Sequence, residues 1–252
     1  MILLMPAPGY VMRMLLEVLF FRSLFRNTKT AIKGSKVVHA SNYWLWIFGM
    51  AFHYSFLLIF LRHFRFIAEP VPAFVLALQN LDGFLQVGTP MFYITSFLLV
   101  GAVGCLFLRR IGSPQLRYIS LANDYFPLFM ILGIGITGII LRHWVKTDIV
   151  SVKELAMGII SFSPITPPDN IHYFFYIHFF LVTVLFAYFP WSKMMHAAGV
   201  FLSPTRNLAN NNREVRHINP WNPDVGYHTY EAYEDEFRDK MIGAGLPVEK
   251  KE

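Results

Sequence analysis

The sequence has few charged residues and almost no cysteine. Of its 252 residues, 15% are charged and one, Cys105, is a cysteine. Soluble globular domains carry about 25% charged residues, so this deficit argues against a water-soluble protein. A single cysteine excludes a disulfide framework. It also excludes an iron–sulfur cluster held by this chain alone, because such a cluster needs about four ligands. No C-x-x-C-H motif for covalent haem attachment occurs.

Apolar residues, in contrast, are abundant. They make up 55% of the chain, with 25 Phe and 5 Trp, and this excludes general disorder. Four stretches have the roughly 20 mostly apolar residues that cross a bilayer. They are residues 43–67, 90–108, 122–141 and 171–191. We therefore expect an all-α membrane protein, an antiparallel bundle of four transmembrane helices with a short soluble C-terminal tail.

A fifth apolar stretch, Val11–Leu24, is interrupted by Arg13, Glu17 and Arg22. Each charge at mid-bilayer costs roughly 2.5–3.5 kcal/mol, so we do not expect this stretch to cross the membrane. Its pattern predicts an amphipathic helix at the membrane interface. Residues 1–42 together are interpreted as an amphipathic and basic cytoplasmic lead-in.

Lysine and arginine set the expected orientation. Seventeen of them lie in 1–42, in 109–121 and after residue 191, whereas five lie on the other side of the four spans. The positive-inside rule then predicts a multi-pass protein of the cytoplasmic membrane with both termini in the cytoplasm. Topology thus explains most of the basic pI of 9.4. With no Gly/aromatic RNA-binding pattern and no DNA-reading helix, nucleic acid is excluded as a partner.

The composition changes after the fourth span. Residues 197–252 contain an Asn-rich run, an Asn-Pro-Trp-Asn-Pro motif and then an acidic stretch. We expect a soluble cytoplasmic tail with a short helix over Glu231–Ile242. A tail of this size cannot build a large core of its own, so it is predicted to dock on a partner subunit.

Four of the nine histidines lie on the spans, where ionisable side chains are functional candidates by default. His53 and His63 lie on the first span, His178 on the fourth and His196 at its cytoplasmic end. Because these two spans run antiparallel, His53 pairs with His196 in an inner layer, and His63 pairs with His178 in an outer layer. Two imidazoles facing each other are what a b haem needs as axial ligands, and a bundle core is a usual place for one. Residues 43–196 are therefore predicted to form a di-haem cytochrome b domain.

The two histidine spacings differ. Ten residues correspond to about 15 Å along a helix and eighteen to about 27 Å. Tilted helices, tilted haem planes and a bend at Pro190 would have to absorb the difference. A compact metal site is a competing use of imidazole. No Asp, Glu or Cys in the same layers completes its ligand set. A transporter and a non-redox membrane anchor remain alternatives. A transporter is expected to show more acids within its spans and often inverted repeats.

Glycines are frequent in two of the spans and permit close approach of a helix or macrocycle: Gly101, Gly104, Gly133, Gly135 and Gly138.

Several motifs carry a family resemblance. The segments Phe52–His63 and Tyr176–His196, with their ten- and eighteen-residue histidine spacings, resemble the haem-bearing helices of the cytochrome b gamma subunit of respiratory nitrate reductase. Arg109–Pro114 is similar to a loop of the same family. A nearer resemblance is to the DsrM family of sulfite-reduction-associated DsrMKJOP complexes. It is carried by Leu16–Thr30, Glu69–Pro72, Val152–Met157, Phe201–Asn212, Asn219–Asn222 and Tyr230–Lys240.

The resemblance implies a function. Such subunits exchange electrons between a membrane quinone, here expected to be menaquinone, and a cytoplasmic iron–sulfur subunit through two b haems ligated by His53, His63, His178 and His196. The implied partner resembles DsrK, a heterodisulfide-reductase-like protein, in dissimilatory sulfur metabolism. A nitrate reductase-type complex is the alternative. Family members have five spans, the first of which has no counterpart in these four, and the family's quinone-site lysine has no match within residues 66–108.

Further site residues are assigned by their side of the membrane. No residue is singled out as catalytic. Acid–base candidates for a quinone site near the outer haem are Glu69, Asp82, His143, Asp169 and His172. Candidate partners of haem propionates are Arg62, Arg65 and Arg142 on the outer side and Lys36, Arg109, Arg110 and Lys193 on the inner side. Anchoring at the lipid headgroups is the competing role of these cations.

Overall fold

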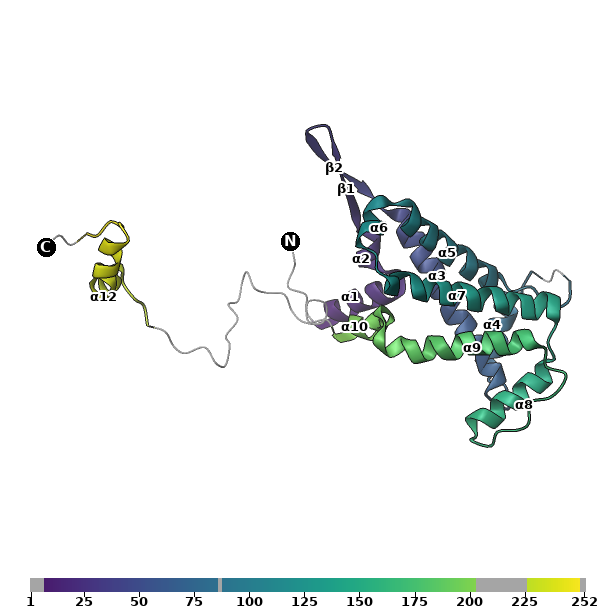
Figure 1. Ribbon diagram of the computed structural model, residues 1–252. Helices are drawn as coiled ribbons and strands as arrows, with labels where there is room; N and C mark the ends of the chain where they lie inside the picture. The colour runs from purple at the N-terminus through teal and green to yellow at the C-terminus, as the bar shows by residue number, and fades with distance from the viewer. Residues whose placement is uncertain (1–6, 86–87, 203–225, 250–252) are drawn as a thin grey trace. The chain divides into compact units, whose positions relative to one another are not determined.

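The computed structural model describes residues 7–85, 88–202 and 226–249 (Figure 1). Over these residues, 7–202 form one compact unit and 226–249 belong to another. The tail stretches 203–212 and Asn219–Asn222, which carry part of the family resemblance, lie outside the described residues.

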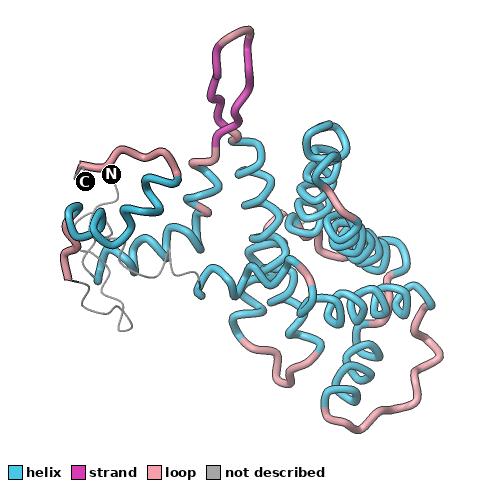
Figure 2. The backbone as a smooth tube through the Cα atoms, turned by 60° about the vertical axis from the view of Figure 1, so that its left-hand side comes forward, coloured by secondary structure: helices cyan, strands magenta, loops and turns pink. Residues whose placement is uncertain are grey.

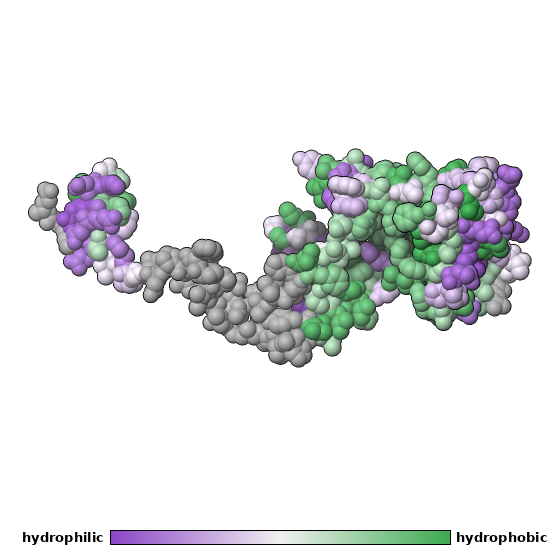
Figure 3. Space-filling view, turned by 90° about the horizontal axis from the view of Figure 1, so that it is seen from below, coloured by the Kyte–Doolittle hydropathy of each residue, from purple (hydrophilic) through white to green (hydrophobic). Residues whose placement is uncertain are grey.

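Four helices of the larger unit are long and apolar enough to cross a membrane, which confirms the predicted fold class. Their spans are Tyr43–Phe66 (helix α3, Tyr43–His63, with the 3₁₀ turn η1, Phe64–Phe66), Ile94–Gly112 (α5), Ala122–Val145 (α7, Ala122–Ile140, with the π turn η2, Leu141–Val145) and Tyr173–Trp191 (α9, Tyr173–Tyr188, with the 3₁₀ turn η3, Phe189–Trp191). Within each apolar window only 6–22% of the residues are buried, so most side chains are at least partly exposed. Figure 3 shows the resulting hydrophobic surface, which suits a lipid environment.

The four spans pack in chain order. Helix α3 packs on α5, α5 on α7, and α7 on α9. Their core is formed by Leu99, Val103, Met130, Ile131 and Leu185. Within the described part of the chain, α3 and α9 are not among the closely packed pairs. The two helices that carry the histidines are therefore separated enough for side chains or a ligand to lie between them.

One end of the bundle, here called the hairpin end, carries the short N-terminal elements. Helices α1 (Ala7–Phe20) and α2 (Arg22–Phe25) are separated by Phe21, whose φ of 48° lies in the left-handed region. Trp46 and Tyr54 of α3 donate hydrogen bonds to the carbonyls of Phe20 and Leu19, which fixes this break against the first span. Over the residues described from Ala7 on, α1 has 14 residues and is not among the spanning helices, in agreement with the prediction from the sequence.

A β-hairpin follows α2 and was not predicted. Strands β1 (Thr28–Lys33) and β2 (Lys36–Ser41) pair antiparallel, with Thr28 opposite Ser41, and Gly34 at the turn has a φ of 65°. Figures 1 and 2 show the hairpin projecting from the bundle, and every residue of β2 is exposed. The same end holds α6 (Pro114–Ile119), the 3₁₀ turn η4 (Lys193–Met195) and α10 (His196–Leu202).

The opposite end, here called the α8 end, holds α4 (Ala73–Asp82) and α8 (Ile149–Ile160). Val152 and Leu155 of α8 form a small buried cluster with Ile171, against which Phe66 of η1 and Phe175 of α9 pack. This cluster connects α8 to the ends of the first and fourth spans.

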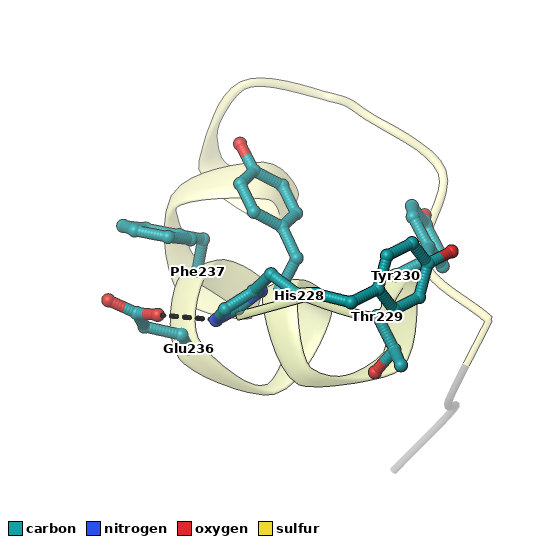
Figure 4. A pocket seen from close by; sticks show the side chains of 7 residues that line it. His228, Thr229, Tyr230, Glu236 and Phe237 are labelled. Atoms are coloured by element: carbon teal, nitrogen blue, oxygen red, sulfur yellow. Dashed lines mark ion pairs between the residues drawn. The ribbon is translucent and has the colours of Figure 1, made fainter. Parts of the chain in front are cut away.

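The second unit contains α12 (Tyr230–Gly243), which agrees with the helix predicted over Glu231–Ile242. Thr229 caps its N-terminus by accepting a hydrogen bond from the Ala232 amide. His228 lies 3.7 Å from a carboxylate oxygen of Glu236 beside a shallow pocket of aromatic side chains (Figure 4). The predicted docking role of the tail remains a prediction.

Candidate haem-binding site

The first histidine pair lies nearer the hairpin end. His53 comes from the middle of α3, and His196 is the first residue of α10. Their ring centroids are 5.9 Å apart and the ring planes are nearly perpendicular, at 87°. Helix α9 ends at Tyr188, and the 3₁₀ turns η3 and η4 bring the chain to His196. The chain thus changes direction around Pro190, where the sequence required a bend.

The second histidine pair lies nearer the α8 end. His63 is the last residue of α3, and His178 lies in α9. Their ring centroids are 6.5 Å apart, and the ring planes are nearly parallel, at 15°. The structure therefore brings the four predicted histidines together in the two predicted pairs.

In all four histidines, Nδ1 is held by a protein oxygen. The ring of His53 donates to the Gly49 carbonyl at 2.7 Å, and the ring of His63 donates to the Ile59 carbonyl at 2.7 Å. The ring of His196 donates to the Lys193 carbonyl at 2.8 Å. Nδ1 of His178 lies 2.9 Å from the Thr137 hydroxyl, which itself donates to the Gly133 carbonyl and so accepts from the ring. A bonded Nδ1–H leaves Nε2 as the unprotonated nitrogen and fixes the ring orientation, as is usual for histidines that ligate a metal.

The ring separations fit an iron atom between the members of each pair. A metal lies about 2 Å from an imidazole nitrogen, which is itself roughly 1.2 Å from the ring centre, so an axially bound pair has centroids about 6.4 Å apart. The observed 5.9 and 6.5 Å bracket that value. Among residues 7–85, 88–202 and 226–249, no three His, Cys, Asp or Glu side chains are placed to hold a metal ion. The donor set therefore suits an iron whose remaining ligands come from a macrocycle such as haem b.

A cavity of about 870 Å³ adjoins the second pair. Both rings line it, as do Gly135 and Gly138 of α7, and it extends to Val152 and Leu155 of α8. A Cβ added at Gly138 would lie 3.3 Å from Cε1 of His178, so this glycine gives the ligand ring its space. Ligand-binding cavities usually measure about 300–1,000 Å³ and are mainly apolar, as this one is.

A buried polar cluster borders the cavity. The guanidinium of Arg62 forms an ion pair with Asp82 at 2.9 Å, and these side chains are only 7% and 3% exposed. Thr95 donates hydrogen bonds to Asp82 from its amide and its hydroxyl, at 2.9 and 2.6 Å. Arg62 and Arg142 each lie 3.9 Å from the centroid of the Tyr93 ring. Arg62, Arg65, Tyr93 and Arg142 all line the cavity, which makes its wall cationic.

The five acid–base candidates lie outside the lining of this cavity. Asp82 contacts it through Arg62, whereas Glu69 forms an ion pair with Lys153 at the surface. His143 packs against Phe97, with centroids 5.7 Å apart. The remaining two candidates are exposed: Asp169 and His172.

The inner candidates separate into two groups. Lys193 donates to Asp124 at 2.7 Å, and Arg110 lies 3.9 Å from the same carboxylate and donates to Ser120. Arg109 is partly buried at the end of α5, and Lys36 lies on the exposed strand β2.

Sequence reasoning missed three side chains of the site. Thr137 and Tyr93 are ordinary residues in apolar stretches, and only the fold shows that they contact His178 and two arginines. Phe21 packs edge-on against His53 with centroids 4.9 Å apart, although 32 positions separate them. The signal that could have indicated the His178 contact was Thr137, a polar residue well inside the third span, two turns after Met130.

The comparisons with known proteins identify the family of the chain. Residues 3–217 match the family model described as nitrate reductase gamma subunit. The chain belongs to the nitrate reductase gamma subunit family. Membership makes it a multi-pass membrane protein of a cytochrome b family, as the resemblance implied.

Two curated relatives share this family likeness. The chain is similar to an "Hdr-like menaquinol oxidoreductase cytochrome b-like subunit" of Archaeoglobus fulgidus, with 46% identity over 214 residues. The similarity to the subunit of the same name from Archaeoglobus profundus is 44% over 216 residues. Each match covers 84% of this chain and 64% of the relative, so the chain spans somewhat less than two thirds of the relatives' length.

Proposed function

We propose that the protein is a membrane cytochrome b subunit that exchanges electrons between menaquinol and a soluble iron–sulfur partner through two b haems. The observation that carries the proposal is the pair of cross-helix histidine sets, each with Nδ1 bonded and a centroid separation of 5.9 or 6.5 Å. His53 and His196 hold one haem, and His63 and His178 hold the other. The names of the two curated relatives support this reaction class.

Haem b, when bound, supplies reversible one-electron transfer. The protein's own residues orient the four imidazoles and place the two pairs ten residues apart on α3, about 15 Å along the helix. The part of the cavity between the second pair and α8 is the proposed quinone site. Its apolar lining suits a hydrophobic ring and tail, and the arginines on its wall suit haem propionates.

Oxidation of a quinol releases two electrons and two protons. Among the acid–base candidates, Asp82 forms an ion pair with Arg62, a residue that lines the cavity. Glu69, His143, Asp169 and His172 would serve a route from the site to bulk water. With both haems bound, the two histidine pairs would provide a route for electrons between the quinone site and the hairpin end.

The chain's composition supports a separate electron partner. With one cysteine the chain cannot hold an iron–sulfur cluster alone, which favours a separate iron–sulfur subunit that exchanges electrons at the hairpin end. We propose a heterodisulfide-reductase-like, DsrK-type subunit in dissimilatory sulfur metabolism, with the tail as its docking segment. The hairpin end and the C-terminus then lie in the cytoplasm. A nitrate reductase-type complex is the second candidate and rests on the family match.

The testing experiment measures haem in the purified protein. A dithionite-reduced minus air-oxidised spectrum, with haem quantified as the pyridine haemochrome, is expected to give two b haems per chain. His63→Ala is expected to leave one haem, because the second pair loses a ligand. His228→Ala in the tail is the matched control and should retain both.

Menaquinol analogues test the substrate. Menadiol is expected to reduce both haems in the wild type and to react at least tenfold more slowly in the His63→Ala variant. Folded protein without haem would overturn the cytochrome proposal and favour a non-redox membrane anchor. Two haems that no quinol reduces would overturn the quinone site while leaving the haem assignment in place.

A further inference from the structure

Two of the four histidines lie where a helix ends. His63 is the last residue of α3, and His196 follows the 3₁₀ turn η4. His53 and His178 lie inside α3 and α9. Helix ends have fewer intrahelical hydrogen bonds and fray more readily than helix interiors. The two terminal histidines therefore depend more on contacts from other elements to keep their rings in place.

At the second pair, that contact comes from Asp82, the last residue of α4. Its carboxylate accepts from the amide and hydroxyl of Thr95, in the first turn of α5. It also pairs with Arg62, the residue directly before His63. One buried carboxylate thus connects the start of α5 to the backbone that carries the terminal ligand.

At the first pair, Asp124 has the equivalent position. It lies in the first turn of α7, where its side chain accepts from the Leu121 amide at 3.0 Å and is 9% exposed. It also binds the ammonium of Lys193 at 2.7 Å. The carbonyl of Lys193 in turn accepts from Nδ1 of His196. Asp124 therefore connects the start of α7 to the residue that orients the other terminal ligand.

The two ends of the bundle share this arrangement although no sequence repeat relates them. At each end, an aspartate accepts a hydrogen bond from a backbone amide at the N-terminus of a span that carries no histidine ligand, α5 for Asp82 and α7 for Asp124. In each, it also holds a basic residue one or three positions before a terminal histidine. Ordinary capping explains the first contact, but it does not explain why the second partner lies beside a haem ligand.

We propose that Asp82 and Asp124 are positioning residues, one for each haem: Asp82 acts on His63 through Arg62, and Asp124 acts on His196 through Lys193. The inference rests on the proposed di-haem function and extends it to residues outside the ligand set. Each carboxylate also neutralises a cation near its own iron. Its loss would favour the reduced, less positive iron at that layer alone.

The experiment compares Asp82→Asn and Asp124→Asn in the full-length purified protein. Redox titration and low-temperature EPR are used, because the gmax of a low-spin haem follows the angle between its two imidazole planes. Asp82→Asn is expected to raise the midpoint potential and change the gmax of the second-pair haem only. Asp124→Asn is expected to do the same to the first-pair haem only. The His63→Ala variant assigns the two signals.

Asp239→Asn, an exposed aspartate of α12, is the matched control and should change neither signal. Lys193→Gln is a milder second variant, because this side chain is 67% exposed and Asp124 keeps its contacts with Arg110 and the Leu121 amide after the replacement. It is expected to lower the midpoint potential of the first-pair haem alone. Asp82→Glu and Asp124→Glu keep the negative charge. Each should therefore show a midpoint potential and gmax closer to the wild-type values than the corresponding Asn variant.

The outcomes separate the two proposals. Two haems in the wild type, with both signals unchanged in Asp82→Asn, Asp124→Asn and Lys193→Gln, would overturn the positioning role and leave the cytochrome proposal intact. Equal changes at both haems in either aspartate variant would also overturn it, because they indicate general loosening of the bundle. A wild-type protein without haem would overturn both.

Discussion

The planes of the paired imidazoles differ between the two layers, and this difference has a measurable consequence. His53 and His196 are nearly perpendicular, at 87°, whereas His63 and His178 are nearly parallel, at 15°. Perpendicular planes act equally on the two iron d orbitals that interact with the ligands. Parallel planes act on one of them, which separates the two orbitals in energy.

We therefore predict two distinct low-spin EPR signals. The haem of the first pair should give the larger gmax and the greater anisotropy, and the haem of the second pair should give a rhombic signal with smaller gmax. EPR of the oxidised protein, compared with the His63→Ala variant, checks the assignment. The prediction is contradicted if His63→Ala removes the signal with the larger gmax.

Thr137 offers a second test at the level of one hydrogen bond. Its hydroxyl lies 2.9 Å from Nδ1 of His178, and that contact raises the basicity of the ligand and so stabilises the oxidised iron. A hydrogen bond is worth about 1 kcal/mol, which corresponds to roughly 40 mV for one electron. Thr137→Val should therefore raise the potential of the second haem by an amount of that order.

The matched control is Thr183→Val. This threonine on α9 is exposed, and its hydroxyl donates to the carbonyls of Phe179 and Phe180 within its own helix. Its replacement removes the same chemical group without touching a ligand ring, so both potentials should stay at the wild-type values. A shift of similar size in the two variants would show that the effect comes from the bilayer-facing surface rather than from the His178 contact.

The sequence predicted the ligands well because they are unusual residues in their context. Histidine is costly in an apolar span, so His53, His63 and His178 stand out from the residues around them. Their partners do not stand out. Thr137 and Tyr93 are common in such segments, and Asp82 was recognised only as one of five candidates on one side of the membrane. Whether one of these residues contacts a ligand or its neighbour depends on how α4, α5 and α7 pack. The hydrophobic periodicity of the sequence contains no information about that packing.

At the scale of elements, α8 is stabilised by a local cap whose strength depends on pH. The carboxylate of Asp148 accepts from the Ser151 hydroxyl at 2.6 Å and from the Val150 amide at 3.1 Å. These bonds, that of Ser151 first, hold the pKa of Asp148 below its usual range. A lowered folded-state pKa means that the group stabilises the helix above its unfolded pKa, about 3.9. That contribution is lost as the pH falls through the folded value.

Asp148→Ala should therefore weaken α8 at neutral pH. We expect hydrogen exchange of the α8 amides to be faster than in the wild type at pH 7, with α12 unchanged. As the pH falls below about 4 and through the lowered folded-state pKa, the difference between the two proteins should shrink, because the wild-type carboxylate becomes protonated. Protection factors compared at each pH measure this. A difference that persists undiminished at pH 3 would show that the side chain acts through packing rather than through its charge.

Elements were predicted unevenly, for a physical reason. The four spans follow from length and hydropathy alone, because a bilayer requires about 20 apolar residues in a helix. The hairpin of β1 and β2 was not predicted because its strands lack a clear alternation: Lys29, Lys33 and Lys36 share one face with Val38 and Ala40. A hairpin that packs against no hydrophobic core has no buried face, so its sequence does not alternate between apolar and polar residues.

For the whole molecule, the arrangement of the spans and the distribution of charge together predict an orientation. The hairpin contains three lysines and residues 109–121 contain three arginines, whereas the loop between α8 and α9, residues 161–171, has neither lysine nor arginine. The positive-inside rule places the hairpin end in the cytoplasm. Electrons would then move from a quinone site near the outer surface to a partner on the cytoplasmic side.

The lone cysteine makes this orientation testable. In a Cys105→Ala background, Ser35→Cys at the hairpin turn and Thr166→Cys in the loop between α8 and α9 place single thiols at the two ends of the bundle, both at exposed positions. A membrane-impermeant maleimide should label Thr166→Cys and not Ser35→Cys in intact cells, and the reverse in inverted vesicles. Labelling after detergent solubilisation, which should be equal for both, shows that each thiol is reactive. The opposite pattern would place the hairpin outside, and the soluble iron–sulfur partner would then have to meet the second histidine pair instead of the first.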